Sequence, residues 1–165
     1  MPAAKPLSST APAEKPMRED IDLVDLRNAS LMDADDVAEL LSMLGYPCDG
    51  ADAGERIHTI IANERQALVL ARHEGMVCGL IALDFMYYLP LDTTTCRITA
   101  MVVTPEAQGR GFGKALLREA ERRARAGGAA RLEITSGSQR TDAHAFYRAC
   151  GYSDGTLRFV KHLGS

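Results

Sequence analysis

Residues 101–114 read MVVTPEAQGRGFGK, and this stretch decides the fold that we expect. A run of apolar strand formers ends at Pro105, and a helical pattern begins near Phe112. The segment between them holds alternating glycines and two bases, Arg110 and Lys114. Glycines let backbone N–H groups approach an anion closely, and the start of a helix adds partial positive charge. The stretch therefore predicts a phosphate-binding loop between a strand and a helix.

The spacing of these glycines excludes two common nucleotide-binding loops. The P-loop pattern needs a glycine five residues before Gly113 and a serine or threonine after Lys114, but Gln108 and Ala115 stand there. The dinucleotide fingerprint needs Gly-x-Gly-x-x-Gly early in a βαβ unit, whereas here the three glycines alternate after several strands. A tight turn that merely requires glycines is the alternative. Three alternating glycines with two bases at a helix start favour anion binding.

The rest of the chain supplies a mixture of strands and helices around this loop. Before it we expect a strand over 21–27, a helix from the cap Asp33 to Gly45, a helix over about 53–63, and strands over 67–72, 76–88 and 96–103. After it we expect a helix over about 112–126, a strand over 131–135, a helix capped by Asp142 that reaches Cys150, and a last strand over 156–162. The order predicts a single α/β (α+β) domain with a mixed sheet.

The composition of the chain limits the classes of binding partner and the cellular compartment that we expect. The chain has 165 residues and a formal net charge of −3, which gives no electrostatic argument for nucleic acid or an anionic membrane as partner. Residues 1–19 are rich in proline and small polar residues, so we expect a disordered tail before a domain over 20–165. The four cysteines are scattered, which predicts no metal site. With no apolar leader or membrane span, we expect a cytoplasmic protein.

Two motifs together resemble the GNAT (GCN5-related) N-acetyltransferase superfamily. One is the spacing Gln108-x-x-Gly111-x-Gly113 between a strand and a long helix, and the other is the stretch 140–147 followed by Gly151-Tyr152. The resemblance covers about residues 20–163. It implies a GNAT fold, with a mixed, mostly antiparallel sheet of six to seven strands flanked by about four helices. It also implies an acetyl-CoA-dependent acyltransferase that moves groups other than amino-acyl groups.

The same resemblance implies where acetyl-CoA, as cosubstrate, would bind. The end of the strand before the loop would hydrogen-bond the pantetheine arm and polarise the thioester carbonyl through backbone groups, while the loop would hold the diphosphate. The cofactor-binding residues implied are Met101, Val102, Val103, Gln108, Gly109, Arg110, Gly111, Phe112, Gly113, Lys114, Arg140 and Tyr147. Many relatives carry an asparagine near the start of the later helix, where this sequence has Arg140 and Thr141, so Arg140 or Ser138 would take its contact.

Tyr147 falls where the family often has a tyrosine near the sulfur, and it is expected to protonate the departing thiolate as general acid. The general base is less defined, because the strand over 96–103 lacks the glutamate that many relatives use. Glu133 is the first candidate. Asp84, Asp92 and His144 are alternatives, as is a chain of water molecules.

The acceptor site in this family would be formed by residues 44–52 and 85–95. Apolar side chains there, such as Tyr87 and Tyr88, suggest partly apolar walls, while Asp84 and Asp92 would attract a cationic amine. The same exposed aromatic residues are also typical of a homodimer interface. We expect acetyl transfer to a primary amine of a small molecule. A protein N-terminus or lysine as acceptor, or a non-catalytic acyl-CoA-binding module, are the alternatives.

Overall fold

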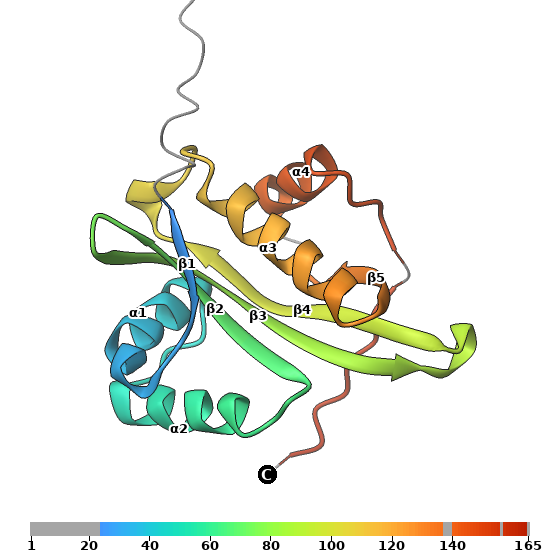
Figure 1. The fold of residues 1–165 in the computed structure, drawn as a ribbon, viewed down its shortest axis with the longest axis horizontal. Helices are drawn as coiled ribbons and strands as arrows, with labels where there is room; N and C mark the ends of the chain where they lie inside the picture. Colours follow the sequence, from blue (N-terminus) through green and yellow to red (C-terminus); the bar gives the residue numbers. More distant parts are fainter. Residues whose placement is uncertain (1–23, 137–139, 156, 165) are drawn as a thin grey trace, which may run out of the picture.

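The computed structural model describes residues 24–136, 140–155 and 157–164, and it forms one sheet with helices on both faces (Figure 1). The helices are α1 (Ala34–Leu44), α2 (Gly50–Ile61), α3 (Phe112–Ala126) and α4 (Thr141–Ala149). The strands are β1 (Asp25–Asn28), β2 (Gln66–His73), β3 (Met76–Tyr88), β4 (Thr93–Val103) and β5 (Ala129–Ile134).

The five strands lie in the order in which they occur along the chain, β1-β2-β3-β4-β5. The first four pair antiparallel, and β5 pairs parallel to β4. A parallel neighbour requires a crossover connection, which α3 provides. The mixed sheet expected from the sequence is therefore confirmed, with the glycine loop at the start of the crossover.

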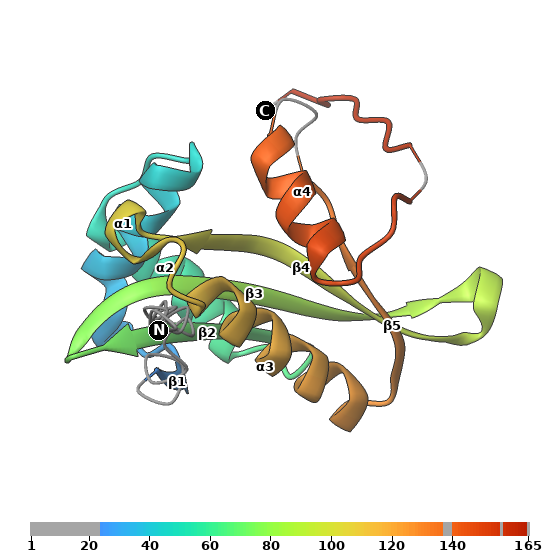
Figure 2. The ribbon, with the colours of Figure 1, turned by 90° about the horizontal axis from the view of Figure 1, so that it is seen from above.

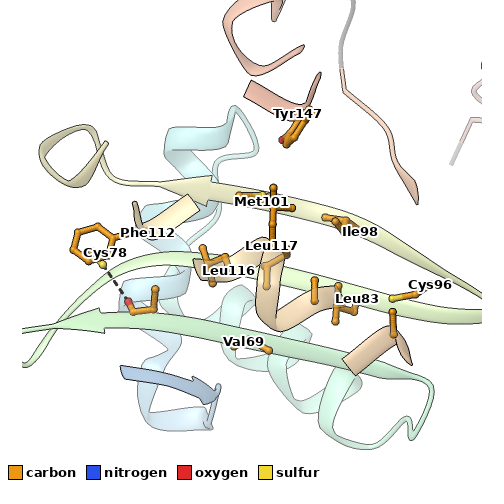
Figure 3. Close-up of a cluster of buried hydrophobic side chains, with 14 of the residues drawn as sticks. Val69, Cys78, Leu83, Cys96, Ile98, Met101, Phe112, Leu116, Leu117 and Tyr147 are labelled. Atoms are coloured by element: carbon orange, nitrogen blue, oxygen red, sulfur yellow. Dashed lines mark hydrogen bonds between the residues drawn. The ribbon is translucent and has the colours of Figure 1, made fainter. Parts of the chain in front are cut away.

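Two hydrophobic clusters lie on opposite faces of the sheet. Helices α3 and α4 cover one face, where Phe112, Leu116 and Tyr147 pack on Ile81 and Ile98 (Figures 2 and 3). Helices α1 and α2 cover the other face, where Val37 and Ile57 belong to a separate cluster. Six consecutive residues of β3 are buried because this central strand is covered on both faces.

The ends of the helices follow from local sequence. Helix α1 ends at Gly45, whose φ of 102° lies in the left-handed region that favours glycine. At the start of α1, the side chain of Asp33 accepts a hydrogen bond from the Ser30 backbone N–H and two from the Arg27 guanidinium. Helix α3 spans 112–126, as expected, and its buried residues include the four predicted to face inward, Leu116, Leu117, Ala120 and Ala124.

Three predictions about elements need correction. In the part of the chain that the structure describes, the sheet has five strands rather than six to seven, because residues 157–164 form no strand and lie exposed. Thr156 and residues 21–23, at the starts of two predicted strands, lie outside the described residues, as does the predicted tail over 1–19. Helix α4 begins at Thr141 with Arg140 at the cap position, so Asp142 lies in the first turn and is not the cap.

Candidate functional site

The glycine loop brings the chain from β4 into α3 through a short 3-10 turn over Pro105–Ala107. Gly109 and Gly111 then adopt φ values of 77° and 91°. Only glycine takes these left-handed conformations at little cost, so both glycines are needed to turn the chain into the helix. Gly111 is the N-cap of α3.

The backbone N–H groups at the start of α3 have no side-chain cap. The helix's own hydrogen bonding begins where the Ala115 N–H donates to the Gly111 carbonyl at 3.0 Å. The N–H groups of residues 112–114 precede that bond and have no acceptor within the helix. Together with the partial positive charge of the helix start, they form a site that suits a phosphate group.

Charged and polar side chains surround this helix start. Lys114 is exposed in the first turn of α3. The Arg110 guanidinium lies 5.3 Å from the centre of the Phe112 ring and 3.2 Å from Nε2 of His73. Gln108 donates from Nε2 to the Val103 carbonyl at 3.1 Å, which ties the loop to the end of β4.

The last part of β4 has one open edge. Strand β5 pairs with β4 only from Thr94 to Ile98, and it ends at Ile134. Beyond that point β4 continues to Val103, paired on its other side with β3. No described strand pairs with residues 99–103 of β4 on this side, and this edge leads to the glycine loop. An extended polar chain can add to such an edge by hydrogen bonding to its backbone.

Tyr147 lies on the face of the sheet that carries the glycine loop. It belongs to the same cluster as Met101 and Phe112, and its side chain is buried (Figure 3). Burial raises the pKa of its phenol, and the positive charge of Arg140 opposes that shift. The phenol therefore stays protonated through the neutral range, as a proton donor must.

The other candidate side chains are distributed over both faces of the sheet and the hairpin end. Asp92 accepts a hydrogen bond from the Tyr87 hydroxyl at 2.8 Å, in the exposed turn between β3 and β4. Asp84 lies opposite Arg97 in the β3–β4 register. His144 lies on α4, and Ser138 lies outside the described residues.

Glu133 is held by two arginines. Its Oε1 accepts from Nε of Arg97 at 2.9 Å, and its Oε2 accepts from Nη2 of Arg131 at 3.0 Å. Both oxygens of this carboxylate are therefore engaged by guanidinium groups, which it holds in position. Arg131 contacts Glu133 from two residues away on β5, whereas Arg97 meets it only through the pairing of β4 with β5, which no local pattern in the sequence indicates.

A cavity of about 670 Å³ lies between β5, α4 and the end of α3. Its lining includes Tyr147 and His144 from α4, Arg131 and Glu133 from β5, and Ser136. The Ser136 hydroxyl is buried and has no hydrogen-bond partner among the described residues. The cavity is large enough for a small polar ligand.

The acetyltransferase (GNAT) family model matches residues 34–152. The chain is also 32% identical over 148 residues to the aminoalkylphosphonate N-acetyltransferase of Salmonella typhimurium, an alignment that covers 88% of this chain and 96% of that protein. The chain belongs to the GNAT acetyltransferase family. It is thus an acyltransferase, as the two sequence motifs indicated.

Solved GNAT structures share the fold. A GNAT family acetyltransferase from Staphylococcus aureus is 24% identical, with a TM-score of 0.73 over 85% of this chain and 98% of that one. The glucosamine-6-phosphate N-acetyltransferase of Arabidopsis thaliana is 16% identical, with a TM-score of 0.72 over 86% of this chain and 99% of that one. At these identities the likeness concerns the fold alone.

Within the described ranges, no group of three or more His, Cys, Asp or Glu side chains could hold a metal ion. Among the helices that the structure describes, none is both long and apolar enough to cross a membrane.

Proposed function

We propose that this GNAT protein transfers an acetyl group from acetyl-CoA to the primary amine of a small molecule. The observation that carries the proposal is the uncapped start of α3, which follows two left-handed glycines at the end of an open strand edge. The backbone N–H groups of residues 112–114 suit a diphosphate, with Arg110, Lys114 and Gln108 beside them. The open edge of residues 101–103 suits the amide groups of a pantetheine arm.

In the proposed reaction the amine nitrogen attacks the thioester carbonyl carbon, a C–N bond forms and the C–S bond breaks. A backbone N–H of residues 101–103 stabilises the charge that develops on the carbonyl oxygen. Tyr147 gives its proton to the departing thiolate, and Arg140, whose charge acts on Tyr147, lies at the start of α4. The attacking amine loses its proton to solvent or to a base. The contacts of Glu133 favour a positioning role over the base role that we first expected.

The acceptor is proposed to be a small molecule because the curated relative in Salmonella typhimurium is named for aminoalkylphosphonates. This makes a short amine with an acidic tail the first acceptor class to test. Tyr147 also lines a cavity of about 670 Å³, and this volume suits a small acceptor.

Two measurements test this function. Acetyl-CoA and CoA should each raise the melting temperature of the protein, because a ligand that binds only the folded state stabilises it. Release of free thiol from acetyl-CoA should then depend on an added amine. Absence of stabilisation by either ligand would contradict the donor assignment. Stabilisation without turnover on any amine would instead indicate a non-catalytic module, and turnover only on peptides would indicate a protein acetyltransferase.

A further inference from the structure

Two arginines and one glutamate form a charged cluster on neighbouring strands. Arg97 on β4 lies beside Glu133 on β5 in the parallel register, and Thr95 lies beside Arg131. The Arg97–Glu133 and Arg131–Glu133 ion pairs measure 2.8 and 3.0 Å. We call Arg97, Arg131 and Glu133 the arginine cluster. With two guanidinium groups and one carboxylate, it carries a net positive charge.

The guanidinium groups are fixed in place and still have donors to offer. Arg131 donates from Nε to the buried Thr95 hydroxyl at 3.2 Å and lies 4.3 Å from the centre of the Tyr88 ring. Arg97 uses Nε and Nη2 toward Glu133. The Nη1 group of each arginine takes part in none of these contacts. A guanidinium has five N–H donors, so each arginine can bind a further acceptor without breaking its ion pair.

The arginine cluster is open to a ligand. The side chains of Arg97 and Arg131 are 45% and 39% exposed. Exposed ion pairs add little to stability, typically about 0–1 kcal/mol. A second arginine on the same carboxylate therefore adds little to the fold, whereas two neighbouring guanidinium groups supply the kind of donors that bind a tetrahedral anion.

The arginine cluster also lies near the point where acetyl transfer is proposed. Arg97 is one residue before Ile98, where the pairing of β4 with β5 ends and the open edge begins. Arg131 and Glu133 alternate along β5 with Leu132 and Ile134, which pack in the cluster of Tyr147, so the arginine cluster lies on the opposite face of the sheet. An acceptor held by the arginines therefore reaches the open edge of β4 from the face opposite Tyr147.

We propose that Arg97 and Arg131, positioned by Glu133, bind the acidic group of the acceptor, and that this group is a phosphonate or phosphate dianion. This inference rests on the proposed acetyl transfer and adds the part of the acceptor that the chain selects. A dianion offers three oxygens and a charge of about −2, as a phosphate group does near pH 7, and both guanidinium groups can then bind it at once.

The test compares two acceptors that differ only in charge, 2-aminoethylphosphonate and its diethyl ester. The ratio of their kcat/KM values does not depend on the fraction of active protein. Wild type should favour the acid strongly. Arg97→Gln and Arg131→Gln should each lower that ratio about 10- to 100-fold, since a charge-assisted hydrogen bond is lost. Arg97→Lys should recover part of the ratio, because it restores the charge but not the fork.

Arg122→Gln is the matched control. Arg122 is also an exposed arginine in an ion pair, but its partner is Glu119 and both lie on α3, away from β4 and β5. Its substitution should leave the ratio unchanged. An unchanged ratio in both Arg97→Gln and Arg131→Gln would overturn the proposal and leave the arginine cluster as a structural ion-pair network.

A binding measurement separates this proposal from the proposed function. Methylphosphonate has no amine and cannot be acetylated, so calorimetry should detect its binding to wild type and weaker binding to both glutamine variants. Equal binding by all three proteins would contradict the subsite even if acetyl transfer occurs. If no amine is acetylated, this measurement still decides the subsite. Aminoethyl phosphate and 2-aminoethanesulfonate complete the panel. The first distinguishes phosphate from phosphonate, and a sulfonate used as well as the phosphonate would contradict selection for a dianion.

Discussion

The start of α3 and the arginine cluster are both suited to anions, but they are built in different ways. The first uses backbone N–H groups at a helix start that follows two glycines in the left-handed region. Its residues are close together in the sequence. The second uses side chains, and two of them, Arg97 and Glu133, are 36 positions apart in the chain and meet through the pairing of β4 with β5. A site made from backbone can be recognised from a short motif, whereas a site made from side chains on paired strands becomes visible only in the fold.

The largest effect should come from Tyr147, which belongs to the same cluster as Phe112 at the start of α3. Tyr147→Phe should lower kcat about 100-fold or more for every acceptor, because general acid catalysis typically contributes that much. The dissociation constant of acetyl-CoA should hardly change. Single-turnover kinetics with calorimetry would measure both values. An unchanged kcat would remove Tyr147 from the mechanism.

The pH dependence of Tyr147 follows from its raised pKa. A phenol donates its proton only below its pKa, and burial moves that value upward from its ordinary position near 10. Turnover should therefore show no alkaline loss attributable to Tyr147 between pH 7 and about 9.5. A wild-type loss in that range that Tyr147→Phe abolishes would contradict the assignment.

Gly111→Ala should disturb the backbone site alone. A residue with a Cβ at a φ of 91° costs about 1–2 kcal/mol, so the loop should move and acetyl-CoA should bind about 10-fold more weakly. Gly111→Asn should lose less, because asparagine tolerates the left-handed region better. Titration calorimetry measures the affinity.

Gly45→Ala is its control, since Gly45 has a φ of 102° at the end of α1, away from the loop. It should lower the melting temperature by a similar amount and leave the affinity for acetyl-CoA unchanged. An equal loss of affinity in both variants would mean that the effect is one of general stability.

Glu133→Gln distinguishes the two roles considered for that residue. If Glu133 positions the arginines, the preference for the acidic acceptor should change about 3- to 10-fold and kcat for the neutral ester should change less than about 3-fold. A loss of about 100-fold or more for both acceptors, with the acid limb of the pH–rate profile removed, would show that Glu133 is the general base. The comparison needs steady-state kinetics over a pH series.

The smallest effect concerns the far half of α3. The hydrogen bond from Arg122 lowers the pKa of Glu119 to about 2. A lowered pKa gives stability that is present above the unfolded value near 4.5 and is lost as the pH falls toward 2. Glu119→Gln should therefore reduce the loss of unfolding free energy over that range by about 0.5–1 kcal/mol. Urea denaturation at pH 6 and pH 3 measures it, and identical losses in both proteins would contradict it.

The elements near the glycine loop could be predicted from the sequence because local chemistry defines them. The helix over 112–126 is amphipathic and is followed by two glycines, and the strand over 76–88 ends at a proline-containing turn. The predicted last strand was wrong because its pattern of residues is suited to a strand, but pairing depends on a neighbouring edge that no local pattern describes. Asp142 was misassigned as a cap because the helix already begins at Thr141, so Asp142 lies inside its first turn.

The site was predicted unevenly for the same reason. The cofactor residues and Tyr147 came from two motifs, and their assignment to acetyl-CoA stays a prediction. Arg97 and Arg131 occupy ordinary polar positions of their strands, and nothing in the sequence indicates that parallel pairing brings Arg97 to the carboxylate that Arg131 contacts on its own strand. Glu133 was noticed as a carboxylate, but its two partners determine what it can do.

The packing at Gly113 has a consequence for how this enzyme can diversify. A Cβ at this position would lie 3.0 Å from Cζ of Phe146, the residue next to Tyr147, and 3.6 Å from Cε of Met101. The first turn of α3, the end of β4 and the tyrosine helix are thus fitted to one another through a space that admits no side chain. A change in any of them requires a compensating change in the others, so these parts must evolve as a unit. The arginine cluster carries no such restriction, and new acceptor preferences can arise there by single substitutions while the acetyl-transfer apparatus stays the same.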